Sequence, residues 1–285
     1  MYPPSFEYHR ASSVAEALSL LGEHSGAKLL AGGHSLIPLM KLRLADPGAL
    51  IDIGRIAELR GISAANGSAR IGALTTHAEV AGSDALPAGL AQAASMVADV
   101  QVRNRGTLGG NVAHADPASD PPTMLLALGA TFHMTGPGGE RSVAAADFFT
   151  GLFETALADG EILTAIEVPA EGADSGSAYA ALRNPASNYA MVAAGVAVTV
   201  ADGACTAASV AVGGLTPHAT RAPAVEAALV GKALDEATIA AAAAAVADDL
   251  GDDILADIHA GAEYRRKIAP VMIQRALTDA AARAG

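Results

Sequence analysis

The chain has 285 residues, of which 51% are hydrophobic and only 4% aromatic, and its formal net charge is −12. That length is enough for about two domains with separate apolar cores, which must be built mainly from Ala, Val, Leu and Ile because aromatic residues are scarce. The negative charge argues against a general nucleic-acid binder, since phosphate backbones are held largely by Lys and Arg.

Cysteine usage and hydropathy exclude further classes of protein. Cys205 is the single cysteine, so this chain can form neither an internal disulfide nor a cysteine-rich zinc or iron–sulfur site. No stretch reaches the roughly 18–20 apolar residues of a membrane span. The start, MYPPSFEYHR, lacks the basic-then-apolar order of a signal peptide. We therefore expect a cytoplasmic protein.

The first predicted elements alternate between strand and helix. Residues 6–9 are typical of a short strand, and residues 13–16 have the S-x-x-E spacing of a helix start. A strand through residues 28–30 then leads into the loop AGGHS at residues 31–35. This order predicts an α/β beginning.

The middle of the chain contains a second glycine-rich segment, RNRGTLGGNVAHADPASD at residues 103–120. We interpret it as a binding loop, because glycine lets the backbone approach a ligand closely and a row of N–H groups can bind an anion without Lys or Arg. Around it the sequence predicts strands at 50–53, 69–73 and 162–168, helices at 90–98 and 121–128, and a hairpin at 131–143.

Residues 169–177, PAEGADSGS, are small, polar and without periodicity, which is typical of a linker. We place the domain boundary there, giving domains at 1–172 and 173–285. The second domain is predicted to be a three-stranded antiparallel sheet backed by helices. Its strands are expected at 178–183, 191–200 and 205–213, and its helices at 222–230, 235–249 and 263–284.

The two glycine segments lie about seventy-five residues apart and could hold the two phosphates of one dinucleotide between them. Neither G-x-G-x-x-G nor G-x-x-x-x-G-K-[ST] is present, so neither the Rossmann fingerprint nor the P-loop motif accounts for such a site. A double glycine taken alone is also compatible with an ordinary tight turn.

Several stretches resemble a known family. AGGHSLIPLMKLRLADP and RNRGTLGGNVAHADPASDPP are similar to the FAD-binding medium subunit of the molybdenum hydroxylases. SFEYHRASS and AEYRRKIAPVMIQRAL bring the chain nearest to the aerobic carbon monoxide dehydrogenases. The resemblance implies an α+β fold, in which a PCMH-type FAD-binding domain of two α/β subdomains precedes a C-terminal domain of three antiparallel strands and helices.

The resemblance also implies which residues bind FAD. The two segments would wrap the pyrophosphate, and three further residues would lie close to the isoalloxazine ring. No residue is expected to act as a catalytic acid, base or nucleophile, since the chemistry belongs to the cofactor. The residues implied are Ala31, Gly32, Gly33, His34, Ser35 and Leu36, then Thr107, Gly109, Gly110 and Asn111, and near the ring Asp120, Arg183 and Tyr189.

Other interpretations of individual residues stay open. Tyr189 is alternatively a core or interface tyrosine, and Asp120 is alternatively the N-terminal cap of the helix that begins at Pro121. We expect no metal ion in this chain, because its histidines and aspartates show no ligand spacing such as H-E-x-x-H. Arg265, Arg266 and Lys267 are interpreted as a solvated basic helix face, and alternatively as a contact with a partner subunit or with the adenine end of a nucleotide.

The resemblance implies an electron-transfer subunit. A small partner subunit would carry two [2Fe-2S] clusters, and a large partner subunit would carry the molybdenum cofactor. The complex would be a dimer of heterotrimers, and it could associate with the inner face of the membrane. FAD would pass electrons to an acceptor such as quinone. The stretch LRNPASNYA also occurs in relatives that oxidise other substrates, so a xanthine-, nicotine- or aldehyde-oxidising complex is an alternative. Two further alternatives are a self-sufficient flavin oxidoreductase and a non-enzymatic subunit that has lost its cofactor and serves only as a scaffold.

Overall fold

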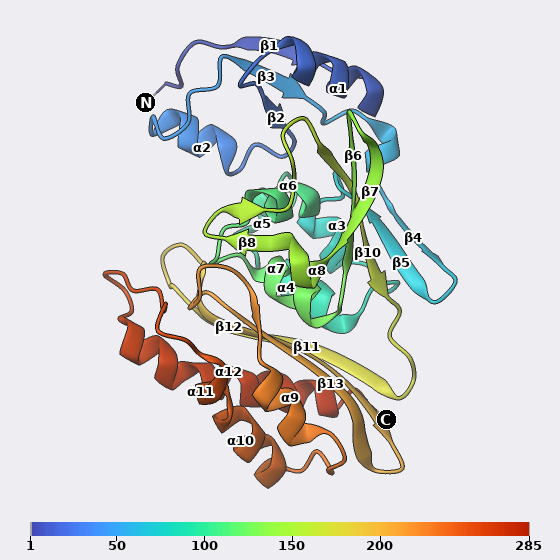
Figure 1. The fold of residues 1–285 in the computed structure, drawn as a ribbon, viewed down its shortest axis with the longest axis vertical. Coiled ribbons are helices and arrows are strands. Elements are labelled where there is room, and N and C mark those ends of the chain that lie inside the picture. Colours follow the sequence, from blue (N-terminus) through green and yellow to red (C-terminus); the bar gives the residue numbers. More distant parts are fainter. Residues whose placement is uncertain (1, 285) are drawn as a thin grey trace.

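Three main sheets follow one another along the chain in the computed structural model, which describes residues 2–284 (Figure 1). The first is parallel, with the strand order β1-β3-β2. Its helix α1 begins where the Ser13 hydroxyl accepts a hydrogen bond from the Glu16 main-chain N–H, as the S-x-x-E spacing predicts. This N-terminal unit, residues 2–54, contains β1 (Glu7–Arg10), α1 (Val14–Glu23), β2 (Lys28–Leu30), α2 (Leu36–Lys41) and β3 (Ala49–Asp52).

The middle unit, residues 55–172, is built on a five-stranded antiparallel sheet with the order β4-β5-β10-β6-β7. The rings of Phe132, Phe148 and Phe149 pack together in its core, with centroids 4.2–5.7 Å apart. Its elements are the 3-10 turn Ala57–Leu59, β4 (Ile62–Ala65), β5 (Ser68–Gly72), α3 (His77–Ala81), α4 (Ala88–Met96), α5 (Val100–Arg103), α6 (Leu108–His114), α7 (Asp120–Ala127), β6 (Thr131–Gly136), β7 (Gly139–Ala144), α8 (Ala145–Phe148), β8 (Phe149–Gly151), β9 (Glu154–Thr155) and β10 (Ile162–Pro169).

The C-terminal unit, residues 173–284, has three long antiparallel strands, and a two-residue strand, β14, extends their sheet at one edge. Helices α9–α12 cover one face of this sheet, and α4 and α7 of the middle unit pack against the other (Figure 1). Its elements are β11 (Ser175–Arg183), β12 (Ala190–Ala201), β13 (Ala204–Gly213), β14 (Thr220–Arg221), α9 (Pro223–Leu229), α10 (Glu236–Ala244), α11 (Val246–Asp249) and α12 (Ala262–Ala281).

The segment 103–120 differs from the expected loop, because α6 occupies its centre and α7 begins at its end. The Thr107 hydroxyl accepts a hydrogen bond from the Gly110 N–H and so caps α6. Ser119 is the N-cap residue of α7, and Asp120 is the first residue inside that helix. The alternative role of Asp120 as the cap is therefore wrong.

No helix within residues 2–284 combines the length and the apolar character that crossing a bilayer requires.

Candidate functional site

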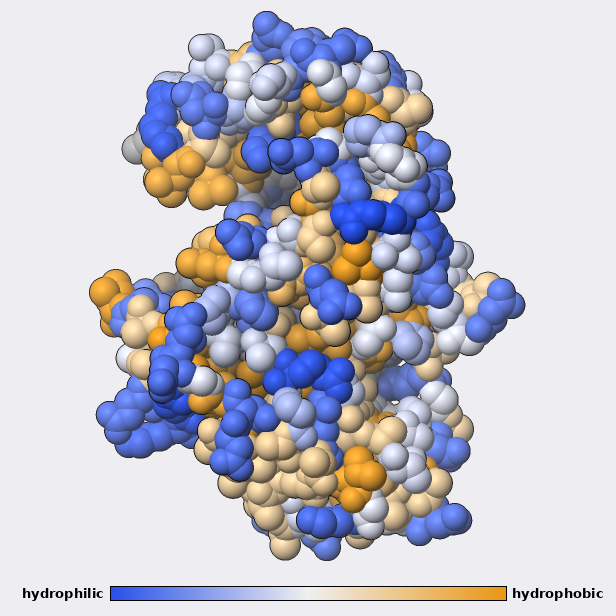
Figure 2. Space-filling model, in the orientation of Figure 1, coloured by the Kyte–Doolittle hydropathy of each residue, from blue (hydrophilic) through white to orange (hydrophobic). Residues whose placement is uncertain are grey.

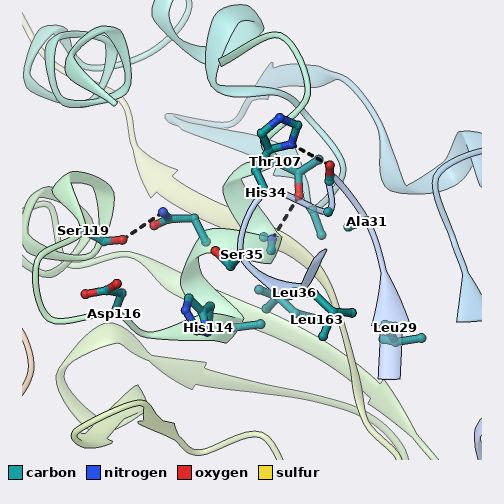
Figure 3. Close-up of a pocket in the computed structure, with 18 of the residues that line it drawn as sticks. Leu29, Ala31, His34, Ser35, Leu36, Thr107, His114, Asp116, Ser119 and Leu163 are labelled. Atoms are coloured by element: carbon teal, nitrogen blue, oxygen red, sulfur yellow. Dashed lines mark hydrogen bonds between the residues drawn. The ribbon is translucent and has the colours of Figure 1, made fainter. Parts of the chain in front are cut away.

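A cavity of about 770 Å³ opens between the N-terminal and middle units and reaches residues 187–189 of the C-terminal unit. Figure 2 shows the surface hollowed between the first two units, and Figure 3 shows residues that line the cavity. Cofactor and small-molecule sites typically have volumes of about 300–1,000 Å³. The predicted site residues that line it are Ala31, Gly32, Gly33, His34, Ser35, Leu36, Thr107, Gly109, Gly110, Asn111, Asp120 and Tyr189.

The two glycine segments touch each other backbone to backbone. A Cβ atom on Gly32 would lie 2.4 Å from the Arg105 carbonyl oxygen and 2.8 Å from the Gly106 Cα. Any side chain at position 32 would therefore push the segments apart. Gly33 has a φ of +76°, a left-handed conformation that favours glycine. The structure thus brings together two segments that are distant in sequence, as the dinucleotide hypothesis requires.

The first loop offers main-chain donors to the cavity. Among the hydrogen bonds within residues 2–284, none is donated by the N–H groups of Gly32, Gly33, His34 or Ser35. The His34 side chain turns back, so that its Nδ1 lies 2.8 Å from the Gly32 carbonyl oxygen. Successive free N–H groups in a turn form a concave site for an anion.

The second segment contributes less main chain than expected. The Leu108 N–H donates to the Thr75 carbonyl and the Gly109 N–H to the Ala73 carbonyl, both at 2.9 Å, and the Gly110 N–H donates to Thr107. These three amides are therefore committed within the fold. The segment offers the cavity the exposed face of Gly110 and the side chains of Thr107 and Asn111.

Tyr189 and Asp120 lie at the end of the cavity that is formed partly by the C-terminal unit. The Tyr189 side chain is half exposed, and burial, together with the Asp116 and Asp120 carboxylates, raises the pKa of its hydroxyl. Asp120 is only 4% exposed and accepts a 2.8 Å hydrogen bond from the Tyr179 hydroxyl. Burial raises the pKa of Asp120 to about 6, although Arg183 and Tyr179 act in the opposite direction.

Arg183 does not line the cavity but contacts residues that do, Asp120 and Asn188. Its Nη2 lies 3.6 Å from Asp120 Oδ2, and its guanidinium donates to the main-chain oxygens of Met96 and Asn188. It therefore fixes the turn that precedes Tyr189 and partly compensates the Asp120 charge.

Sequence reasoning did not assign His77 to the binding site. Its side chain lines the cavity, is 2% exposed and has an Nδ1 atom without a hydrogen-bond partner among the described residues. Burial, and secondarily the Arg103 charge, lowers the pKa of His77 to about 4, so the ring is neutral at pH 7. The polar run Thr75-Thr76-His77, which follows strand β5 after Ala73 and Leu74, is the signal that could have identified it.

A second missed stretch is residues 157–163, which also line the cavity. It contains the turn dipeptide Asp159-Gly160, and Gly160 has a φ of +79°. Leu163, beside the labelled loop residues in Figure 3, supplies apolar surface there. Leu21 and Lys28 of the N-terminal unit line the cavity as well.

His34, His77, His114, Asp116 and Asp120 all line the cavity. Among the residues that the structure describes, they do not form a cluster of three metal-type ligands.

Two family descriptions match nearly the whole chain. The "FAD binding domain in molybdopterin dehydrogenase" matches residues 4–171, and the "CO dehydrogenase flavoprotein C-terminal domain" matches residues 177–280. The chain belongs to the FAD-binding medium subunits of the molybdenum hydroxylases.

Relatives of this medium-subunit family match the chain end to end. The carbon monoxide dehydrogenase medium chain of Afipia carboxidovorans is 42% identical over 100% of this chain and 99% of its own length. The glyceraldehyde dehydrogenase medium chain of Sulfolobus acidocaldarius is 35% identical, covering 99% and 100%. The solved carbon monoxide dehydrogenase of Hydrogenophaga pseudoflava, in a form lacking the Mo-pyranopterin moiety of its cofactor, superposes with a TM-score of 0.95, 44% identity and full coverage of both chains.

These matches confirm the family resemblance and the predicted fold class. The chain is an oxidoreductase subunit with an FAD-binding domain, and carbon monoxide dehydrogenases are among its similar relatives. The medium-subunit family also includes chains with other substrates in their names, such as the nicotine 6-hydroxylase medium subunit of Paenarthrobacter nicotinovorans, 34% identical.

Proposed function

We propose that the cavity binds FAD, with the diphosphate against the first glycine loop and Thr107. The observation that carries this proposal is the backbone contact at Gly32, which places free N–H groups of one segment beside the second segment. Main-chain N–H groups suit a phosphate in a chain of net charge −12, because they supply partial positive charge without Lys or Arg.

The unpaired polar atoms of the cavity fit the same ligand. Asn111 donates from Nδ2 to Ser119, but its Oδ1 has no partner within residues 2–284, and neither has His77 Nδ1. Buried polar atoms without partners are costly, so their presence in a cavity wall indicates a ligand that completes them. FAD carries donors and acceptors along its ribityl, ribose and ring portions.

Tyr189, Asp120 and Arg183 are proposed to surround the isoalloxazine end. Tyr189 presents an aromatic face and a hydroxyl that stays protonated at neutral pH. Arg183 holds the turn before Tyr189, and Asp120 adds a buried group whose charge depends on pH near 6. Bound FAD supplies both one-electron exchange and two-electron storage, while these residues orient the ring and shield it from water.

We propose that the subunit collects electrons from the [2Fe-2S] clusters of a small partner subunit and passes them to an acceptor such as quinone. A large partner would hold the molybdenum cofactor. Exposed aromatic rings at the cavity support a partner surface there. Tyr189 is 49% exposed and Phe153 is 51% exposed. The Phe153 ring centroid lies 5.2 Å from that of His114, which lines the cavity.

Carbon monoxide is the substrate that we propose for the complex. The chain is 42% identical over 100% of its length to one carbon monoxide dehydrogenase medium chain, compared with 35% for the glyceraldehyde dehydrogenase chain. We also propose the domain division 1–172 and 173–285, which the bounds of the two family matches, 4–171 and 177–280, support.

The test is purification of the native complex and of this chain alone. We expect one flavin per chain in both, and bleaching of the flavin bands by carbon monoxide in the complex only. Steady turnover by the isolated chain would instead favour a self-sufficient oxidoreductase. An isolated chain that stays colourless after saturation with FAD would contradict the binding site, and bleaching by nicotine or an aldehyde but not by carbon monoxide would contradict the substrate.

A further inference from the structure

Two imidazoles and a carboxylate converge on the N-terminal unit, outside the FAD cavity. Glu7 and His9 lie two residues apart in β1 and therefore point to the same side of that strand. His24 is the C-cap residue of α1, the helix labelled beside β1 in Figure 1. None of the three lines the cavity, so this cluster is independent of the proposed flavin site.

The distances within the cluster are those of ligands around one metal ion. Glu7 Oε2 lies 3.4 Å from His9 Nε2 and 3.6 Å from His24 Nδ1. Zn–N and Zn–O bonds of about 2.0–2.2 Å give a tetrahedron whose edges are roughly 3.3–3.6 Å. The ligand atoms of all three residues lie within 4.8 Å of one another, so a small side-chain rotation would close the remaining edge.

These side chains would also lose little conformational freedom on coordinating a metal ion. The two imidazole rings stack with their centroids 4.2 Å apart and are each about three-quarters buried, with side-chain exposures of 29% and 26%. The Glu7 carboxylate is 69% exposed and can adjust to an ion that enters from solvent. Two imidazoles with one carboxylate favour Zn²⁺ and similar transition metals over Mg²⁺ or Ca²⁺, which prefer oxygen ligands.

We propose that Glu7, His9 and His24 form a binding site for a divalent transition-metal ion of the Zn²⁺ class, with water in the fourth position. The ion would tie the edge strand β1 to the C-terminal end of α1. The chain continues from His24 into β2 and then into the first glycine loop, so the ion would brace the segment from which that loop emerges. The ion would increase the stability of the folded chain, because it binds the native state and not the unfolded chain.

The experiment uses the tag-free, full-length chain after treatment with EDTA. Titration with ZnCl₂ in a calorimeter should show one ion per chain, and addition of CoCl₂ should produce the visible absorption of a four-coordinate site. We expect His24→Ala and His9→Ala each to weaken Zn²⁺ binding by at least about tenfold, or 1.4 kcal/mol. The matched control is His259→Ala, because His259 is exposed and lies outside the cluster; it should bind as the unsubstituted chain does.

Folding of the variants is checked by their melting temperatures without metal, and His24→Gln replaces His24→Ala if the latter is unstable. Zn²⁺ should raise the melting temperature of the unsubstituted chain and of the His259 variant, but not of a His9 and His24 double variant. Equal Zn²⁺ affinity in the double variant and the unsubstituted chain, or no binding by the unsubstituted chain at millimolar ZnCl₂, would overturn the proposal. Either result leaves the FAD proposal untouched.

Discussion

Gly109 and Gly110 are adjacent in α6 but have opposite surroundings. Gly110 is exposed toward the cavity, and a Cβ there would meet Thr107 Oγ1 at 2.8 Å and otherwise only Ala31 at 3.8 Å. Gly109 is buried, and a Cβ there would lie 2.5 Å from the Ala73 Cβ. A valine at position 110 therefore tests ligand binding, and a valine at position 109 tests packing.

We predict that Gly110→Val removes bound FAD and leaves the fold intact, because its side chain occupies ligand space and disturbs only the Thr107 cap, worth about 1 kcal/mol. Gly109→Val should instead destabilise the chain by roughly 1–3 kcal/mol through overpacking. Flavin content by absorbance and urea unfolding measure the two effects. A yellow Gly110→Val protein with normal flavin content would refute the placement of FAD.

Asp120 and His77 make the free energy of unfolding depend on pH in opposite directions. The pKa of Asp120 is raised from 3.8 to about 6, so between these pH values the folded chain holds a proton that the unfolded chain has released, and stability falls as pH rises. The pKa of His77 is lowered from 6.5 to about 4, so the unfolded chain holds the extra proton and stability rises with pH.

We predict that Asp120→Asn removes the first dependence and leaves the second. Relative to the unsubstituted FAD-free chain, the variant should gain stability from pH 4 to pH 6 by up to about 1.4 kcal/mol per pH unit. Asparagine can still accept the Tyr179 hydrogen bond, so the geometry is retained. Urea unfolding at several pH values measures the difference, and a difference that does not change with pH would contradict the raised pKa of Asp120.

At the scale of single elements, α12 is fixed by one arginine. Arg265 is 4% exposed and donates to the main-chain oxygens of Ala260, Met191 and Gly214 as well as to Asp257, 2.6 Å away. The interpretation of residues 265–267 as a solvated basic face is therefore wrong for Arg265. Lys267 does fit that interpretation, since it is exposed and pairs with Glu263 one turn earlier.

We predict that Arg265→Met destabilises the chain by about 3 kcal/mol, because buried carbonyls and the Asp257 carboxylate lose their donor. Lys267→Ala is the control from the same helix and should leave the unfolding free energy nearly unchanged, since exposed ion pairs contribute little. Urea unfolding of both variants makes the comparison. Similar losses in the two would show that the Arg265 contacts do not hold the helix.

Element prediction succeeded where local signals agree and failed where packing decides. The Ser13 cap and the alternation of β1, α1 and β2 are readable from spacing. The glycines of the segment 103–120 favour a binding loop, because they let the backbone approach a ligand closely and because glycine is unfavourable in a helix. Its centre, α6, is helical because Thr107 caps it and Gly109 packs on Ala73 next to the end of β5. That contact spans thirty-six residues of sequence, from 73 to 109.

At the scale of the whole molecule, the middle and C-terminal units share a core. Tyr179, Ala193 and Ala211 of the C-terminal sheet belong to the same apolar cluster as α4 and α7. Gly213 permits this contact, because a Cβ there would lie 2.0 Å from the Thr123 side chain of α7. The sequence supports a linker at 169–177, but it does not reveal that the cores on either side are continuous, since that depends on which face of each strand meets α7.

The shared core predicts that the covalent linker is dispensable after folding. Residues 172–174 are exposed, so a protease site inserted between Ala173 and Asp174 can be cleaved in the native protein. We expect the two fragments to co-elute on size exclusion with FAD still bound, because separating them would expose the apolar faces of α4, α7 and the sheet to water. They should part only in urea, in a single transition with flavin release. As a control, the uncleaved insertion protein should elute at the same volume. Fragments that separate in buffer would show that the continuous cluster contributes little free energy and that the two parts are independent domains.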